Sequence, residues 1–160
     1  MIKPVGSDEL KPLFVYDPEE HHKLTHEANE LPSVVISSQA AGNAVMMGAG
    51  YFNPLKGFMR LADAMGAAES MTLTDGSFFP VPVLCLVPDV SAIQGAKRIA
   101  LRDPNVEGNP VLAVMDVEGI EEQGEEYLLD LKAKTGAVAY DRLKMRVDRE
   151  RLPLVHRQRP

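Results

Sequence analysis

Apolar and polar positions in the first third of the chain follow the spacing of a helix. Leu24, Ala28 and Leu31 fall at i, i+4 and i+7, a stripe that predicts an amphipathic helix over residues 18–30. Asp17 precedes this stripe and is a typical helix N-cap, because its carboxylate can accept a hydrogen bond from an unpaired backbone N–H. A short apolar run at residues 13–16 predicts a strand before this helix.

Two further helices are predicted on either side of a loop. Residues 39–47 are rich in small and flexible side chains and follow a capping residue, Ser37, which favours a helix packed closely against another element. Gly48 and Gly50 can end this helix with a positive φ. After the loop, apolar residues fall on one face of the next helix at Phe58, Leu61, Ala62, Met65 and Ala68.

From Met71 onward the apolar period changes to that of strands. Residues 74–77, Thr-Asp-Gly-Ser, form a hairpin signal between two apolar segments. Apolar runs predict strands at residues 34–36, 83–87, 97–102 and 110–117. Two or three helices followed by short strands and tight turns predict an α+β fold with a mostly antiparallel, partly closed sheet.

Composition limits the kind of protein this chain can be. Its 160 residues, 45% of them hydrophobic, suffice for one buried core, so we expect one domain. Cys85 is the only cysteine in the sequence, which excludes an internal disulfide, and its apolar neighbours favour a core position over a reactive thiol. No stretch approaches the roughly 18 apolar residues of a membrane helix, and the first residues lack a signal-peptide pattern. We expect a cytoplasmic protein.

Charge divides the chain near residue 126. Residues 1–126 carry a net charge of -11, whereas residues 127–160 carry +5. The basic residues of this tail include Arg142, Lys144, Arg146, Arg149, Arg151, Arg157 and Arg159. Such a tail fits either a nucleic-acid-binding arm or a segment that folds against its own acidic domain, and the acidic body favours the second.

Three segments resemble one enzyme family. Residues 48–59 read G-A-G-Y-F-N-P-L-K-G-F-M, similar to the G-x-[YF]-S-P-L-x-G-F-M signature of ATP sulfurylases (sulfate adenylyltransferases). Residues 71–83 resemble the L-x-D-G hairpin and P-x-P strand of that family, and residues 99–117 resemble its paired strands. The ordered set covers about residues 1–122 and looks closest to the enzymes of sulfur-oxidising bacteria.

The resemblance implies an amino-terminal PUA-like domain over residues 1–122, built as a mostly antiparallel, partly closed barrel with helices near its start. Residues 123–160 would then be a divergent basic tail. Within it, residues 125–133 predict a helix and residues 143–147 alternate like a strand, before a flexible end. In the family, this domain supports a nucleotide-binding domain that converts ATP and sulfate to adenylyl sulfate and pyrophosphate, or runs the reverse reaction.

The family's catalytic signatures, Q-x-R-N-P and H-x-x-H, are absent from this chain. We therefore assign no catalytic, cofactor-binding or metal residue and expect the chain alone to be inactive, with ATP and sulfate binding the catalytic domain. The resemblance implies a docking surface for that domain or for a second copy, formed by the helix at residues 39–47 and a loop containing Tyr51, Asn53, Pro54, Leu55, Gly57 and Phe58. A free-standing RNA-binding or regulatory module that uses the basic tail is the alternative.

Other candidate sites have simpler explanations. His22 and His26 are four residues apart, a spacing that can place two metal ligands on one helical face, yet they lie opposite the apolar stripe and are expected to face solvent. The eight methionines are typical of adaptable core packing. Acidic residues between Glu118 and Glu126 predict a solvated helix start.

Overall fold

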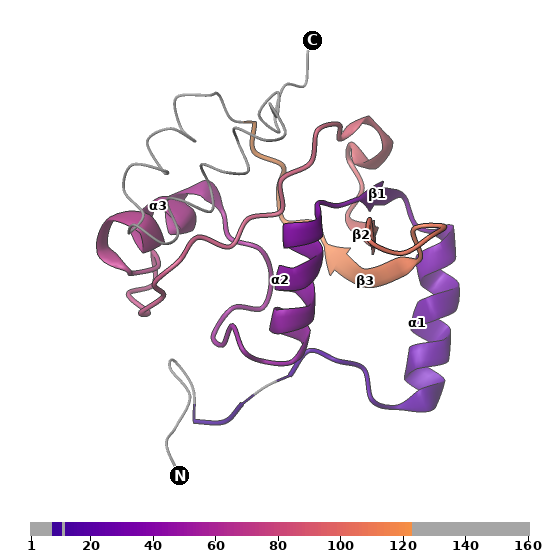
Figure 1. The fold of residues 1–160 in the computed structure, drawn as a ribbon, viewed down its shortest axis with the longest axis horizontal. Helices are drawn as coiled ribbons and strands as arrows, with labels where there is room; N and C mark the ends of the chain where they lie inside the picture. Colours follow the sequence, from indigo (N-terminus) through magenta and orange to yellow (C-terminus); the bar gives the residue numbers. More distant parts are fainter. Residues whose placement is uncertain (1–7, 11, 123–160) are drawn as a thin grey trace. The chain divides into compact units, whose positions relative to one another are not determined.

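The computed structural model describes residues 8–10 and 12–122 (Figure 1). These residues form two compact units. Unit 1 contains the described residues up to Gly57 together with Val90–Ile120, and unit 2 contains Phe58–Asp89 with residues 121 and 122. The predicted helix and strand of the basic tail lie outside the described residues.

The first helix of unit 1, α1 (Pro18–Glu30), confirms the prediction from the apolar stripe. The Oδ1 atom of Asp17 accepts a hydrogen bond from the backbone N–H of Glu20 at 2.8 Å, so the N-cap forms as expected. Ala28 is buried, while Leu24 is half-buried on the same stripe. Local sequence signals therefore determine both the start and the inward face of this helix.

The second helix, α2 (Ser38–Gly48), begins one residue before the predicted start. The Ser37 hydroxyl accepts a hydrogen bond from the Ala40 backbone N–H at 3.2 Å. Its small residues allow close packing, and Ala40, Ala41, Met47 and Gly48 are buried. The chain leaves the helix through Gly50, whose φ of 80° lies in the left-handed region that favours glycine.

Unit 1 is organised around a three-stranded sheet in the order β1 (Ser33–Val35), β2 (Arg98–Arg102) and β3 (Val111–Asp116). Strand β1 runs parallel to β2, with Ser33 opposite Ala100, and β3 runs antiparallel to β2. The central strand is the most buried: Ile99, Ala100 and Leu101 expose 2% of their surface or less. Helices α1 and α2 both contact β3, and Figure 1 shows the strands between these two helices.

The α+β class is confirmed, but the sheet differs from the expected one. Among the described residues it is open and mixed rather than mostly antiparallel and partly closed. Residues 83–87 do not form a strand, because the prolines at positions 80, 82 and 88 remove backbone donors around them. The strand predicted at residues 13–16 is also absent. There, the backbone N–H groups of Leu13 and Phe14 both donate to the carbonyl of Gly48, at 2.8 and 3.2 Å.

Unit 2 contains α3 (Leu61–Ser70), which begins three residues later than the apolar pattern suggested. The carboxylate of Glu121 accepts a hydrogen bond from the backbone N–H of Leu61 at 3.0 Å, so a side chain distant in sequence caps the start of the helix. The helix ends at Ser70, and its C-cap residue Met71 adopts the left-handed conformation with φ 55°.

A hairpin follows α3, as the turn residues predicted, although it is reduced to one isolated bridge between Thr72 and Phe78. The Oδ1 atom of Asp63 accepts hydrogen bonds from both the backbone N–H and the hydroxyl of Thr74, at 2.8 and 2.6 Å. Residues 59 and 83 are also joined, since the backbone N–H of Met59 donates to the carbonyl of Val83 at 2.8 Å. Side-chain and isolated backbone bonds hold unit 2 where sheet pairing is sparse.

Candidate docking surface

The loop predicted to form a docking surface, residues 51–58, is fixed by its own backbone. The N–H of Tyr51 donates to the carbonyl of Met46 at 2.9 Å, which ties the start of the loop to the last turn of α2. Within the loop, the N–H of Asn53 donates to Gly50 at 3.3 Å and the N–H of Leu55 donates to Phe52 at 2.8 Å. The peptide bond before Pro54 is cis. The loop is thus a defined structure whose exposed side chains have a fixed base.

The predicted loop residues are not equally available to a partner. Tyr51 is 73% exposed, whereas Asn53, Pro54, Leu55, Gly57 and Phe58 are half-buried. Residues up to Gly57 belong to unit 1 and Phe58 begins unit 2, so the loop is also a covalent connection between the units. Of the six predicted docking residues, Tyr51 is therefore the one best placed to contact another molecule.

A second exposed feature of unit 1 comes from the segment that precedes α1. The Phe14 ring lies directly over Gly48, and a Cβ atom added at Gly48 would come within 2.5 Å of the ring atom Cε1. The side chain of Leu10 approaches Gly50 in the same way, at 3.1 Å from an added Cβ. The rings of Phe14 and Tyr16 meet edge to face with centroids 6.2 Å apart. Gly48 and Gly50, at the end of α2, therefore leave the space in which the Phe14 and Leu10 side chains pack.

Most of this segment nevertheless remains open to solvent. Leu10 is 54% exposed, Leu13 and Phe14 are each 45% exposed, and Tyr16 is 75% exposed. We call these four residues the apolar ledge. The sequence prediction missed the ledge because the apolar run at residues 13–16 was interpreted as a strand. The signal that could have found it is the pair of glycines at positions 48 and 50, which permits close approach by another segment.

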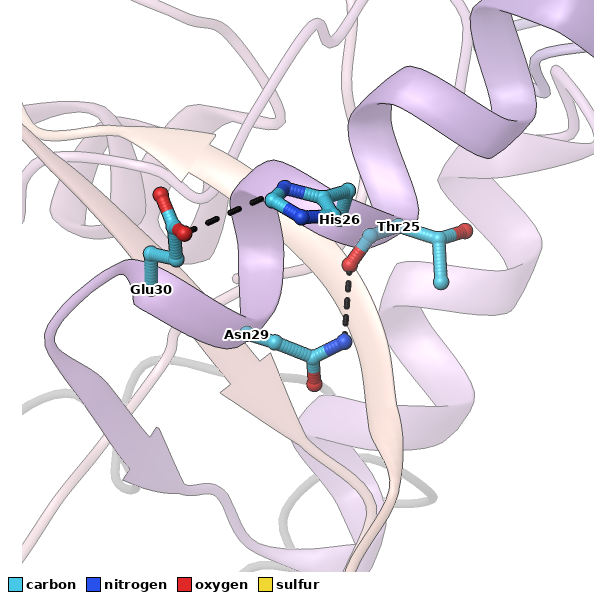
Figure 2. Close-up of polar contacts among 4 residues, drawn as sticks. All are labelled: Thr25, His26, Asn29 and Glu30. Atoms are coloured by element: carbon cyan, nitrogen blue, oxygen red, sulfur yellow. Dashed lines mark hydrogen bonds and ion pairs between the residues drawn. The ribbon is translucent and has the colours of Figure 1, made fainter.

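His22 and His26 of α1 are exposed on the helix surface, as predicted. Figure 2 shows that His26 faces Glu30, with 4.0 Å between Nδ1 and Oε1, and that the Asn29 amide donates to the Thr25 carbonyl at 3.0 Å. Within residues 8–10 and 12–122, no three histidine, cysteine or acidic side chains come together as a potential metal site. The geometry of α1 therefore corresponds to a solvated helix face.

Cys85 occupies a half-buried position in unit 2. Burial raises the pKa of its thiol to about 12, so the nucleophilic thiolate is scarce at neutral pH. At the hairpin, the backbone N–H and the hydroxyl of Ser77 hold the pKa of the Asp75 carboxyl below its ordinary value. Both shifts have local structural causes: desolvation disfavours the Cys85 thiolate, and the Asp75 carboxylate accepts a hydrogen bond within its own turn.

The remaining charged candidates contribute no site that the structure describes. Glu118, Glu121 and Glu122 are exposed, and Glu121 supports the start of α3. The basic residues proposed for RNA contact lie outside the described residues. Among the helices that the structure describes, none has the length and apolar content needed to cross a membrane.

Comparison with known proteins relates the chain to one family. A family profile for the PUA-like domain matches residues 2–140. The sulfate adenylyltransferase of Allochromatium vinosum is 75% identical over 122 residues, which are 76% of this chain and 31% of that protein. The sulfate adenylyltransferase of the Riftia pachyptila sulfur-oxidizing endosymbiont is 73% identical over 128 residues, covering 80% of this chain and 29% of that protein. The chain thus spans about 30% of the length of these two curated relatives.

A solved structure is also similar to this chain, at lower sequence identity. The hexameric APS kinase from Thiobacillus denitrificans superposes with a TM-score of 0.63 at 33% sequence identity. The superposition covers 78% of this chain and 24% of that protein. The similarity to both relatives and the solved structure is therefore confined to a part of much larger polypeptides.

Proposed function

Because the chain belongs to the PUA-like domain family, in the form found in sulfate adenylyltransferases, we propose that it serves as the non-catalytic platform of such an enzyme. The platform would support the larger part of the polypeptide, which converts ATP and sulfate to adenylyl sulfate and pyrophosphate or runs the reverse reaction. ATP and sulfate would bind that larger part, and this chain would hold no cofactor. The proposal places the chain in the cytoplasm, where ATP is available.

The exposure of Tyr51 is the observation that carries this proposal. Its side chain is 73% exposed, while its backbone is anchored to α2 through the 2.9 Å hydrogen bond to Met46. Exposed aromatic side chains on a fixed backbone are typical centres of protein interfaces, because they bury a large area with little loss of conformational freedom. Tyr51 also lies within the signature segment that resembles the family.

The test combines the full chain with the portion of the Allochromatium vinosum enzyme that the chain does not match. We expect the chain alone to form no ATP from adenylyl sulfate and pyrophosphate. When the two polypeptides are co-expressed, we expect them to co-purify and Tyr51→Ser to weaken the complex about thirtyfold or more. Val106→Ser is the matched control, because Val106 is 50% exposed on unit 1 but lies outside the loop.

Two results would contradict the proposal. One is adenylyl transfer by the isolated chain at the rate of a full-length relative. The other is that the chain neither co-purifies with the remaining polypeptide nor increases the soluble yield of that polypeptide. A second copy of the chain is the competing partner, because the solved relative is described as a hexamer. Sedimentation of the isolated chain at increasing concentration distinguishes the two partners.

A further inference from the structure

The apolar ledge, defined above as Leu10, Leu13, Phe14 and Tyr16, is a group of exposed apolar side chains that the loop proposal does not use. Each of its side chains is at least 45% exposed. Contiguous exposed apolar residues are uncommon on proteins that act alone and usually mark a surface that another molecule covers. The ledge is structurally defined, because the backbone of Leu13 and Phe14 is held by hydrogen bonds to Gly48.

We propose that the ledge is a second contact surface for the remaining polypeptide of a sulfate adenylyltransferase, beside the contact made by Tyr51. This inference rests on the proposed function. About 70% of the length of the relatives lies beyond the part matched by this chain, so a large protein surface accompanies this domain in those enzymes. The backbone hydrogen bond from Tyr51 to the last turn of α2 connects the loop to the same helix end on which Phe14 rests.

Charge around the ledge favours this partner over a second copy of the chain. Acidic residues outnumber the one basic residue around it: the ledge is flanked in sequence by Asp8, Glu9, Asp17, Glu19 and Glu20, and Lys11 lies within it. Two ledges brought face to face would also bring these carboxylates together, which opposes association. A complementary partner would have an apolar centre and a basic rim, and its attraction to the ledge would weaken with added salt.

The geometry also assigns different roles to the two aromatic residues. Phe14 has one face on Gly48 and leaves 45% of its surface for a partner. Tyr16 is 75% exposed, and its ring meets the edge of Phe14. Phe14 would therefore form the seated centre of the contact, while Tyr16 would extend it with a hydroxyl at the rim. Both residues belong to the kinds of side chain that dominate interface energies.

The experiment measures binding of the full chain to the non-matching portion of the Allochromatium vinosum enzyme. We expect Phe14→Ser and Tyr16→Ser each to raise the Kd about tenfold or more, and Val106→Ser to leave it unchanged. Tyr16→Ser guards against loss of folding, because Tyr16 packs mainly at the surface. We further expect salt at about 0.5 M to raise the Kd of the wild-type chain.

The outcomes separate this inference from the proposed function. If the wild-type chain does not bind the non-matching portion, and circular dichroism shows that this portion is folded, the proposed function fails. If it binds, and Tyr51→Ser weakens binding while folded Phe14→Ser and Tyr16→Ser do not, only the ledge inference fails. Concentration-dependent dimerisation of the isolated chain that Tyr16→Ser abolishes would also overturn it, since the ledge would then join two copies.

Discussion

Gly66 lies inside α3. Replacing a helical glycine with alanine usually stabilises a protein, but at this position the structure predicts a loss of stability. A Cβ atom at this position would press against the backbone carbonyl oxygen of Thr72. That oxygen belongs to the main chain just after the helix, where Met71 adopts φ 55° and the N–H of Thr72 donates to the carbonyl of Gly66 at 3.3 Å. A side-chain neighbour could rotate away, but this carbonyl cannot move without disturbing the end of the helix. Gly66 is therefore required for close packing of two backbones.

Gly42 provides the matched control, because it lies within α2 and an added Cβ would meet no atom within 4 Å. Gly42→Ala should stabilise the protein by up to about 1 kcal/mol, since alanine loses less backbone entropy in a helix. Gly66→Ala gains the same term, but overpacking costs about 1 to 3 kcal/mol and weakening of the Thr72 hydrogen bond costs about 1 kcal/mol more. The net result is a loss of about 1 to 3 kcal/mol.

Urea unfolding of the wild type and both variants measures this difference directly, provided that the slope is the same in all three. Thermal unfolding gives a second readout, with about 2 to 4 °C for each kcal/mol in a chain of this size. We expect the melting temperature to rise for Gly42→Ala and to fall for Gly66→Ala. If Gly66→Ala is stabilised as much as Gly42→Ala, this result would contradict the close approach of the Thr72 carbonyl oxygen to Gly66.

Three further predictions concern single side chains. Asp63→Ala should cost about 1 to 2 kcal/mol in urea unfolding, because it removes the acceptor of both Thr74 hydrogen bonds; wild-type stability would show that these bonds contribute nothing. Asp17→Ala should cost about 1 kcal/mol and lower the helical circular dichroism signal, because the N-cap of α1 is lost; an unchanged signal and stability would contradict this. Cys85 should react with iodoacetamide about a thousandfold more slowly in the folded chain than in urea near pH 8, since its pKa rises from 9.0 to about 12; equal rates would contradict burial of the thiol.

The raised pKa of Cys85 also makes the stability of the folded chain depend on pH. Its pKa is higher in the folded chain than in the unfolded chain, so between about pH 9 and pH 12 the folded state binds more protons. Stability from this group is therefore fully present below pH 9 and is lost as the pH rises toward 12. An unfolding series in this range, with Cys85→Ala as the reference, isolates the contribution of the thiol.

Local signals predicted the helices well and long-range pairing poorly. The stripe at Leu24 and Ala28 and the cap at Asp17 are short-range features, and α1 has the predicted bounds. The parallel pairing of Ser33 with Ala100 joins residues far apart in sequence, so no local pattern could indicate it. In the same way, no local pattern could indicate that the start of α3 is capped by Glu121, which lies 60 residues away from its hydrogen-bond partner Leu61.

For the candidate site, the sequence marked a region but could not give the exposure of its residues. The signature segment marked the loop, yet exposure of Tyr51 and partial burial of Leu55 depend on how the loop folds over its own backbone. The ledge was missed because apolar residues normally predict burial, whereas Phe14 is held with only one face against the protein. An exposed apolar segment can be distinguished from a strand only when its backbone partner is known.

Gly48 connects these observations, because it determines where the ledge lies. The glycine supplies both the carbonyl that accepts from Leu13 and Phe14 and the open space that the Phe14 ring fills. Unlike the backbone oxygen near Gly66, the atom that an added Cβ would meet here belongs to a half-exposed side chain that can move. An alanine at position 48 would thus displace the ring at a small cost in stability while leaving every ledge residue in the sequence. Any loss of partner binding would then arise from the position of the ring, which separates the geometry of the ledge from its composition.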